Sequence, residues 1–161
     1  MPITRILSVA AAIFMIDRIV KIWVVEWLEL RNIYTIDVWP PYLNLRMAWN
    51  EGINFGLFGS GSDVTKWILV SVALLISLVL LVAFRKARGF WLQLSVGLVV
   101  GGALGNVFDR LTYGAVADFL NMSCCGIDNP YAFNVADISI FLGVVGLVLL
   151  DGKKSRKKRK R

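Results

Sequence analysis

Histidine is absent from this chain of 161 residues, and its absence removes several kinds of chemistry at once. A Ser-His-Asp triad, a Cys-His pair and a His-ligated metal all require an imidazole. The two cysteines, Cys124 and Cys125, are adjacent in the sequence. Neighbouring cysteines rarely bridge each other, and they give neither a disulfide framework nor a zinc-binding spacing. We therefore expect ordinary thiols, no metal site and no cofactor.

Long polar stretches are scarce as well. The chain is 57% hydrophobic, with a mean hydropathy of +0.66, which is well above the average of soluble proteins. Its net charge of +7 arises entirely in residues 151–161, which contain eight basic residues and one acidic residue. Next to an apolar helix, such a tail is more typical of an anchor on anionic cytoplasmic lipid than of a nucleic-acid-binding segment.

Four apolar runs are long enough, or nearly so, to cross a bilayer as helices that rise about 1.5 Å per residue. They cover approximately residues 6–25, 67–84, 90–108 and 132–150. The sequence therefore predicts an α-helical integral membrane protein with four transmembrane helices, forming a single membrane domain. The first run lacks a small-residue cleavage site and is interrupted by charges, so we expect it to remain in the mature protein.

Basic residues in short loops predict the orientation of the helices. The link Arg85–Gly89 has three positive charges and no negative ones, and the C-terminal tail is more basic still. Both are predicted to be cytoplasmic, which leaves residues 26–66 and 109–131 on the outer side. The first outer segment is too long for a bare loop in a compact domain. Its tryptophans and tyrosines suit the headgroup region, and we expect short β-strands there, near the membrane surface.

With this topology, the polar residues of interest collect near the outer membrane surface. Charged groups in or beside hydrocarbon are costly unless they pair or face a wet cavity, so they are functional candidates. They are Asp17 and Lys21 in the first helix, Asn106, Asp109 and Arg110 at the end of the third, Asp118 in the following loop, and Asn134 and Asp137 at the start of the fourth. A single shared depth predicts one interfacial site.

Several of these residues also have plain structural interpretations. Asp17 and Lys21 lie one helical turn apart and can form a structural pair. Asn134 precedes a helical run and can cap it. Asp109 can form an interfacial ion pair with its neighbour Arg110.

Asp118 and Asp137 are harder to explain structurally, because neither has a compensating cation close by in the chain. If they approach each other, both cannot ionise cheaply, so one pKa rises and the other falls. The ionised carboxylate can take a proton from water while the protonated one donates to a carbonyl oxygen. Such a pair can hydrolyse a peptide bond without histidine or metal.

At this point the chain resembles a known family, the bacterial lipoprotein signal peptidases, also called signal peptidase II. The resemblance covers nearly the whole chain and rests on five motifs in order: DRIVK at Asp17–Lys21, NEGINFG at Asn50–Gly56, GGALGNVFDR at Gly101–Arg110, VADF at Val116–Phe119 and FNVAD at Phe133–Asp137. Any one motif alone would be weak, whereas together they are specific. One position departs from the family pattern: Asn54 stands where a small residue, commonly alanine, is usual, which bears on local loop packing and inhibitor fit.

The resemblance implies an aspartic endopeptidase of the inner membrane. It would remove signal peptides from diacylglyceryl-modified prolipoproteins and cut before the lipidated cysteine. By motif, the catalytic aspartates correspond to Asp118 and Asp137. The supporting polar residues correspond to Asn50, Gly52, Asn106, Asp109, Arg110 and Asn134, together with Asp17 and Lys21.

The resemblance also implies a small periplasmic β-cradle between the first and second helices, and a short periplasmic helix between the third and fourth. Lipidated prolipoproteins and membrane phospholipid would be the partners of a monomeric enzyme, with no nucleic acid and no cofactor involved. The cyclic peptide globomycin inhibits the family.

Two other classes of function remain open. A transporter or channel using Asp17, Lys21 and Asp137 as an ion relay predicts flux across liposomes and polar groups in the inner leaflet, where the sequence has almost none. A membrane scaffold whose basic tail recruits a partner predicts that deleting the residues after Leu150 destroys function.

Overall fold

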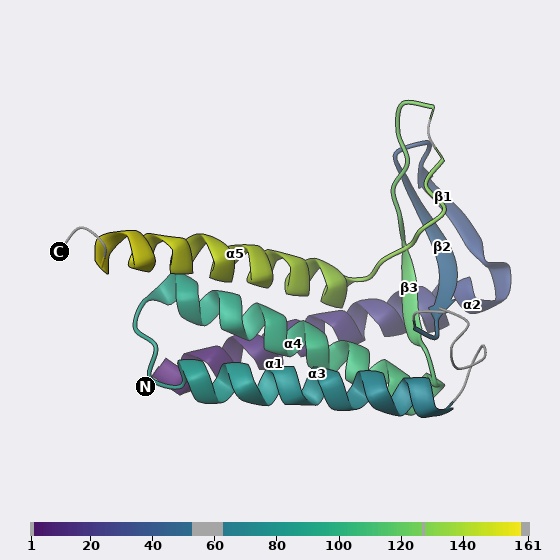
Figure 1. The fold of residues 1–161 in the computed structure, drawn as a ribbon. Helices are drawn as coiled ribbons and strands as arrows, with labels where there is room; N and C mark the ends of the chain where they lie inside the picture. Colours follow the sequence, from purple (N-terminus) through teal and green to yellow (C-terminus); the bar gives the residue numbers. More distant parts are fainter. Residues whose placement is uncertain (1, 53–62, 127, 159–161) are drawn as a thin grey trace.

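Four long helices run side by side, with a small sheet at one end of the bundle (Figure 1). The computed structural model describes residues 2–52, 63–126 and 128–158, with side chains up to residue 150. The long helices are α1 (Pro2–Lys21), α3 (Asp63–Phe84), α4 (Phe90–Tyr113) and α5 (Val135–Lys158). Each contains one of the four predicted apolar runs or most of it.

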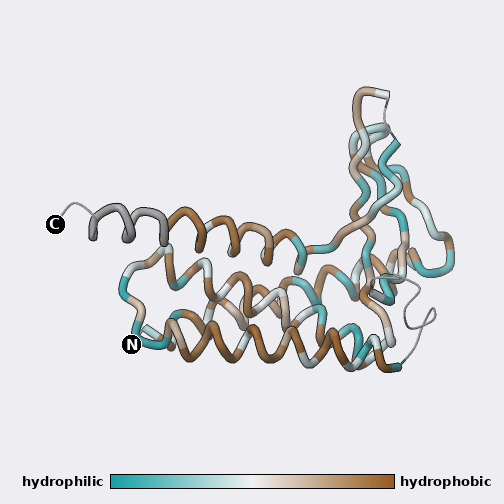
Figure 2. The backbone as a smooth tube through the Cα atoms, in the orientation of Figure 1, coloured by the Kyte–Doolittle hydropathy of each residue, from teal (hydrophilic) through white to brown (hydrophobic). Residues whose placement is uncertain are grey.

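Within the described residues, α3 and α4 are the two helices long and apolar enough to cross a membrane. The apolar part of α5, Val135–Leu150, is shorter, and α1 contains four charged residues. Apolar residues cover much of the length of the helices, whereas polar residues gather toward the sheet (Figure 2). Only Val70 and Ser77 of α3 are buried, so most of its apolar side chains face outward. Such a surface is favourable against lipid and unfavourable in water.

Helix α4 lies at the centre of the bundle, and small residues let its neighbours approach closely. A methyl group at Gly101 would come within 2.6 Å of the carbonyl oxygen of Ala10 in α1. One at Gly102 would come within 2.5 Å of the carbonyl oxygen of Ala136 in α5. These glycines therefore bring the backbones of α1 and α5 close against two adjacent faces of α4.

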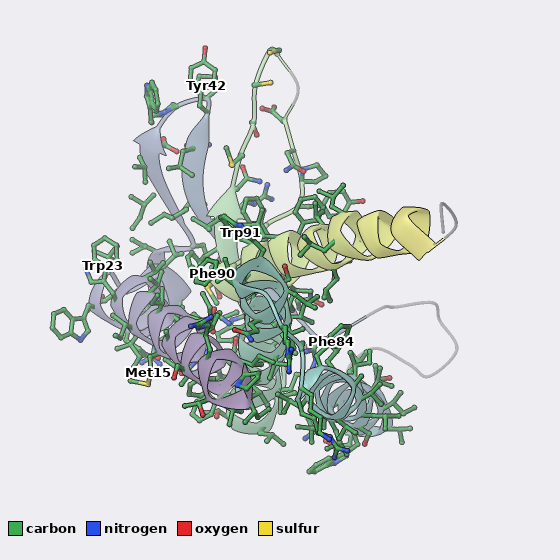
Figure 3. The ribbon with its side chains drawn as sticks, turned by 90° about the vertical axis from the view of Figure 1, so that its left-hand side faces the viewer. Met15, Trp23, Tyr42, Phe84, Phe90 and Trp91 are labelled. Atoms are coloured by element: carbon green, nitrogen blue, oxygen red, sulfur yellow. The ribbon has the colours of Figure 1, made fainter. Side chains whose placement is uncertain are left out.

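After α1 the chain continues as a π-helix, η1 (Ile22–Trp27), and a single turn, α2 (Leu30–Ile33). The antiparallel sheet follows, with strands β1 (Thr35–Trp39), β2 (Leu43–Asn50) and β3 (Val116–Asn121) in the order β1-β2-β3. Buried residues of η1, α2 and the sheet, among them Val24, Leu30 and Phe119, form one hydrophobic core. Viewed along the helices, the sheet extends to one side of the bundle, with Tyr42 near its tip (Figure 3).

The strands predicted in residues 26–66 are present as β1 and β2. The short helix expected between the third and fourth long helices is not found in residues 114–126 or 128–134, and β3 lies there instead. The reason is non-local: β3 is almost wholly buried between β2 on one edge and Phe133, which bonds to Leu120, on the other. The third long helix also continues to Tyr113, so Asp109 and Arg110 are helical and not part of a loop.

The start of α1, the end of α5 and the link between α3 and α4 lie at one end of the bundle, and the sheet lies at the other (Figure 1). Helices α1 and α4 therefore run toward the sheet, while α3 and α5 run away from it. As a result the C-terminal ends of α1 and α4 meet the N-terminal end of α5 beside β3. The candidate site is at this junction.

Candidate functional site

The first turn of α5 fixes the side chain of Asp137 through a reciprocal cap. The side-chain Oδ1 of Asn134 accepts from the backbone N–H of Asp137 at 2.9 Å. In return, Asp137 Oδ2 accepts from the backbone N–H of Asn134 at 3.2 Å. This is the capping-box pattern, which satisfies two helix N-H groups and places a carboxylate at the positive end of the helix dipole. The predicted cap at Asn134 is therefore confirmed.

The amide nitrogen of Asn134 is left to make a second set of contacts. Its Nδ2 donates to Asp118 Oδ1 at 2.6 Å and to Asn106 Oδ1 at 3.3 Å. Asn134 is fully buried, so each of its polar atoms needs a partner, and the three bonds supply them. One asparagine thus holds a strand carboxylate, Asp118, beside the helix carboxylate, Asp137.

Asn50, at the end of β2, holds the other oxygen of Asp118. Its Nδ2 donates to Asp118 Oδ2 at 3.1 Å, while its Oδ1 accepts from the backbone N–H of Gly52 at 3.0 Å. Gly52 has a φ of +111°, and a methyl group there would lie 2.6 Å from the side chain of Leu69. Glycine is therefore needed for the turn that orients the Asn50 amide toward the carboxylate.

Helix α4 supplies the next pair of polar residues. Asn106 Nδ2 donates to Asp137 Oδ1 at 2.9 Å. One turn further along, Arg110 Nη1 donates to the backbone oxygen of Asn106 at 3.3 Å. The guanidinium of Arg110 is also close enough to interact electrostatically with both Asp137 and Asp118. A positive charge therefore lies beside the two carboxylates.

Asp118 is 4% exposed, and its acidity reflects this environment. Burial, followed by the negative charge of Asp137, raises the pKa of Asp118 from its usual 3.8 to about 6. Hydrogen bonds from Asn50 and Asn134 and the charge of Lys21 act in the opposite direction. The negative charge of Asp137 therefore favours the protonated form of Asp118, which suits Asp118 to the role of a proton donor.

A buried ion cluster lies directly behind these carboxylates. We call it the quartet, and it consists of Asp17, Arg18 and Lys21 from α1 and Asp109 from α4. Lys21 pairs with Asp17 at 3.0 Å and also with Asp109, and Arg18 pairs with Asp17 at 2.9 Å and also with Asp109. The predicted pair of Asp17 and Lys21 is confirmed. The alternative in which Asp109 pairs with Arg110 is wrong, because Asp109 faces α1.

The structure brings the predicted site residues together at one end of the bundle. Asn50, Asn106 and Asn134 bond to the aspartates directly, and Arg110 interacts with them through its charge. Gly52 acts through Asn50, and the pair Asp17–Lys21 joins Asp109 behind them. Asn54, the position that departs from the family pattern, lies outside the described residues. The described residues contain no cluster of three or more histidine, cysteine or acidic side chains arranged to hold a metal ion.

Comparison with known proteins identifies the family. The sequence profile described as Signal peptidase (SPase) II matches residues 9–151, which is most of the chain. The chain belongs to the signal peptidase II family.

Lipoprotein signal peptidases from several bacteria match most of this sequence. A lipoprotein signal peptidase from Methylobacterium sp. (strain 4-46) is 38% identical over 148 residues, covering 92% of this chain and 88% of the relative. One from Gloeobacter violaceus is 40% identical over 134 residues, covering 83% and 73%. A solved "Bacterial membrane enzyme structure by the in meso method" has a TM-score of 0.78 at 26% identity, covering 97% of this chain and 92% of that one. The chain is therefore a membrane protein with the fold of a bacterial membrane enzyme.

Arg18 was not predicted from the sequence to belong to the site. It lies next to Asp17 and was considered only as a charge that interrupts an apolar helix. One signal was available: in α1, Asp17, Arg18 and Lys21 sum to one excess positive charge, which requires a distant acid if the group is buried. Asp109 is that acid.

Proposed function

We propose that this chain is an aspartic endopeptidase that removes signal peptides from diacylglyceryl-modified prolipoproteins, cutting before the lipidated cysteine. Membership of the signal peptidase II family supports the class of substrate. The observation that carries the chemistry is the contact of Asn134 with both Asp118 and Asp137. It supports a catalytic dyad built from residues that are far apart in the sequence.

The dyad would hydrolyse the peptide bond with a water molecule as the nucleophile. Asp137, whose oxygens accept from Asn106 and Asn134, takes the role of the ionised base. Asp118, whose pKa is raised to about 6, takes the role of the acid. The base removes a proton from water as the water oxygen bonds to the carbonyl carbon, and the acid protonates the carbonyl oxygen. The tetrahedral intermediate then breaks its C–N bond as a proton passes to the leaving nitrogen.

Asn50, Asn106, Arg110 and Asn134 would support this reaction. The three asparagine amides fix the rotation of the carboxylates, which keeps the acid and the base oriented for attack. Arg110 lies beside the dyad and is free at most of its donors to bind a substrate carbonyl or the developing oxyanion. Gly52 supports Asn50 through the bond to its Oδ1.

The substrate would reach the dyad from within the bilayer. We infer an inner-membrane enzyme crossing four times, with the sheet end periplasmic and the basic tail cytoplasmic, in line with the basic link Arg85–Gly89. Exposed aromatic residues near the sheet end, among them Trp23, Trp27 and Trp39, suit a headgroup layer at that level. The lipidated cysteine would then lie at the depth of the dyad, and its acyl chains would lie along the apolar helices. A single chain contains all the proposed catalytic groups, which supports a monomer.

The test is cleavage by purified enzyme in detergent or lipid, with one prolipoprotein peptide prepared with and without the diacylglyceryl group. We expect hydrolysis of the lipidated form at the bond before the modified cysteine, read out by mass spectrometry of both products. Cleavage at another bond, or equal turnover of both forms, would contradict the proposed substrate. An ion-transport role is not favoured, because the candidate residues gather at one end of the bundle and do not continue along it.

A further inference from the structure

The quartet of Asp17, Arg18, Lys21 and Asp109 has no net charge, with two acids and two bases packed together. Asp17 and Asp109 are fully buried, Lys21 is 3% exposed and Arg18 is 8% exposed. Each cation bridges both acids. Removing one member of such a cluster leaves an uncompensated charge in a medium that solvates it poorly.

The quartet also holds the backbone next to each aspartate of the dyad. Asp17 Oδ1 accepts from the N–H of Ala136 at 3.1 Å, and Asp109 Oδ2 accepts from the N–H of Ala117 at 3.3 Å. Ala136 immediately precedes Asp137, and Ala117 immediately precedes Asp118. The same three-residue sequence, Val-Ala-Asp, therefore docks twice on one ion cluster, once from a helix and once from a strand.

Arg18 joins the two halves of this arrangement and has no role in the chemistry described above. One of its nitrogens, Nη2, contacts both Asp17 and Asp109, and its guanidinium carbon lies 4.8 Å from the ring centre of Phe108. The ring of Phe108 therefore lies against the guanidinium, and it packs edge-on against Phe14 of α1. A lysine at this position could supply the charge, although it would lose the planar contact with the ring.

We propose that Arg18 is a positioning residue for both aspartates: it completes a neutral quartet whose carboxylates fix the backbone preceding Asp118 and Asp137. This inference rests on the proposed function, because it assumes that these two carboxylates perform the reaction. Without Arg18 the quartet would hold one excess negative charge, and Asp17 and Asp109 would repel each other. The two Val-Ala-Asp segments that they hold would then move apart.

The elements packed around Asp118 carry several charged and titratable groups: Arg18, Lys21 and Asp17 on α1, Asp109 and Arg110 on α4, and Asp137 on α5. Of these, Asp137, Lys21 and Arg110 interact electrostatically with Asp118. Among them, Lys21 acts on Asp118 in the direction of a lower pKa. A quartet with one added negative charge opposes that effect and favours the protonated acid. Loss of Arg18 should therefore shift the pH dependence of activity, which loss of packing alone would not do.

The experiment compares Arg18→Gln with Arg18→Lys, and with Arg5→Gln as a matched control in the same helix. Arg5 bonds to Gln93 near the other end of the bundle, away from the dyad. Using a lipidated prolipoprotein peptide, we expect Arg18→Gln to lower kcat on the order of 10- to 100-fold with little change in KM, because the dyad is misplaced by a fraction of an ångström. The limb of the pH profile that falls on the alkaline side should move to higher pH. Arg18→Lys should recover most of kcat, and Arg5→Gln should match the parent enzyme.

A double variant allows the same test if Arg18→Gln folds poorly. Asp17→Asn combined with Arg18→Gln restores neutrality and retains an oxygen that can accept from Ala136. It should move the alkaline limb back toward that of the parent. An unchanged kcat or an unmoved alkaline limb in folded Arg18→Gln would overturn the inference. So would a double variant whose alkaline limb lies at higher pH than that of the parent. If Asp118→Asn and Asp137→Asn are inactive in the same assay, such a result refutes only the role of Arg18; if they are active, the proposed function itself fails.

Discussion

Asp118 links the geometry of the site to a measurable pH dependence. Burial and the charge of Asp137 raise its pKa to about 6, so the folded protein loses this proton as pH rises through that value. Between pH 3.8 and about 6 the folded state binds more protons than the unfolded chain, and stability therefore falls as pH rises. A dyad that needs one protonated member should also lose activity over the upper part of this range.

We therefore predict that kcat/KM for a lipidated peptide falls as pH rises through about 6. Asn50 donates to Asp118 and lowers its pKa, so Asn50→Ala should move the falling limb to higher pH. The matched control is Asn44→Ala, on the same strand but opposite Asn121 and remote from the dyad. A pH profile of kcat/KM for the three proteins gives the result. A limb that moves to lower pH in Asn50→Ala would contradict the assignment.

At the scale of residues, the sequence predicted the members of the site better than their partners. Asn134 was expected to cap a helix, and it does, but its bond to Asp118 depends on a strand that the sequence did not reveal. Asp109 was paired with the wrong arginine because its partners, Arg18 and Lys21, come from another helix that is remote in the sequence. Asp109 faces α1, while Arg110 interacts with the dyad.

At the scale of elements, the apolar runs predicted the helices because local composition and period determine them. Strand β3 was missed because its burial comes from β2 and Phe133, which are remote in the sequence. The contact between α4 and α1 at the quartet likewise depends on a glycine whose role is steric. A methyl group at Gly105 would lie 2.7 Å from Asp17 Oδ2.

This close approach predicts that Gly105→Ala is destabilising and impairs cleavage. The added methyl must displace Asp17 or separate α4 from α1, at a cost of about 1–3 kcal/mol. Thermal unfolding in detergent and turnover of the lipidated peptide measure the two effects. The control is Ala83→Val, which adds volume on the exposed side of α3 and should leave both unchanged. If Gly105→Ala has the stability and turnover of the parent, the methyl group is accommodated without displacing Asp17, which would contradict this prediction.

At the scale of the whole molecule, the orientation in the membrane can be tested with the chain's own thiols. Cys124 and Cys125 are the only cysteines, and both are exposed and unbridged in the loop that follows β3. If the sheet end is periplasmic, a membrane-impermeant maleimide should label them in intact spheroplasts. In a protein with both cysteines changed to serine, a reporter introduced by Lys86→Cys should be labelled only after permeabilisation. The reverse pattern would contradict the positive-inside assignment.

The account depends most on Asp118 and Asp137 acting together on one water molecule. The most direct measurement is turnover of a lipidated prolipoprotein peptide by purified Asp118→Asn and Asp137→Asn, alongside the parent protein. Asparagine keeps the shape of each side chain and one of its two acceptor oxygens, so both variants should remain folded in the membrane, as checked by thermal unfolding. We predict that each loses cleavage to the background rate. Parental turnover by either folded variant would contradict the dyad.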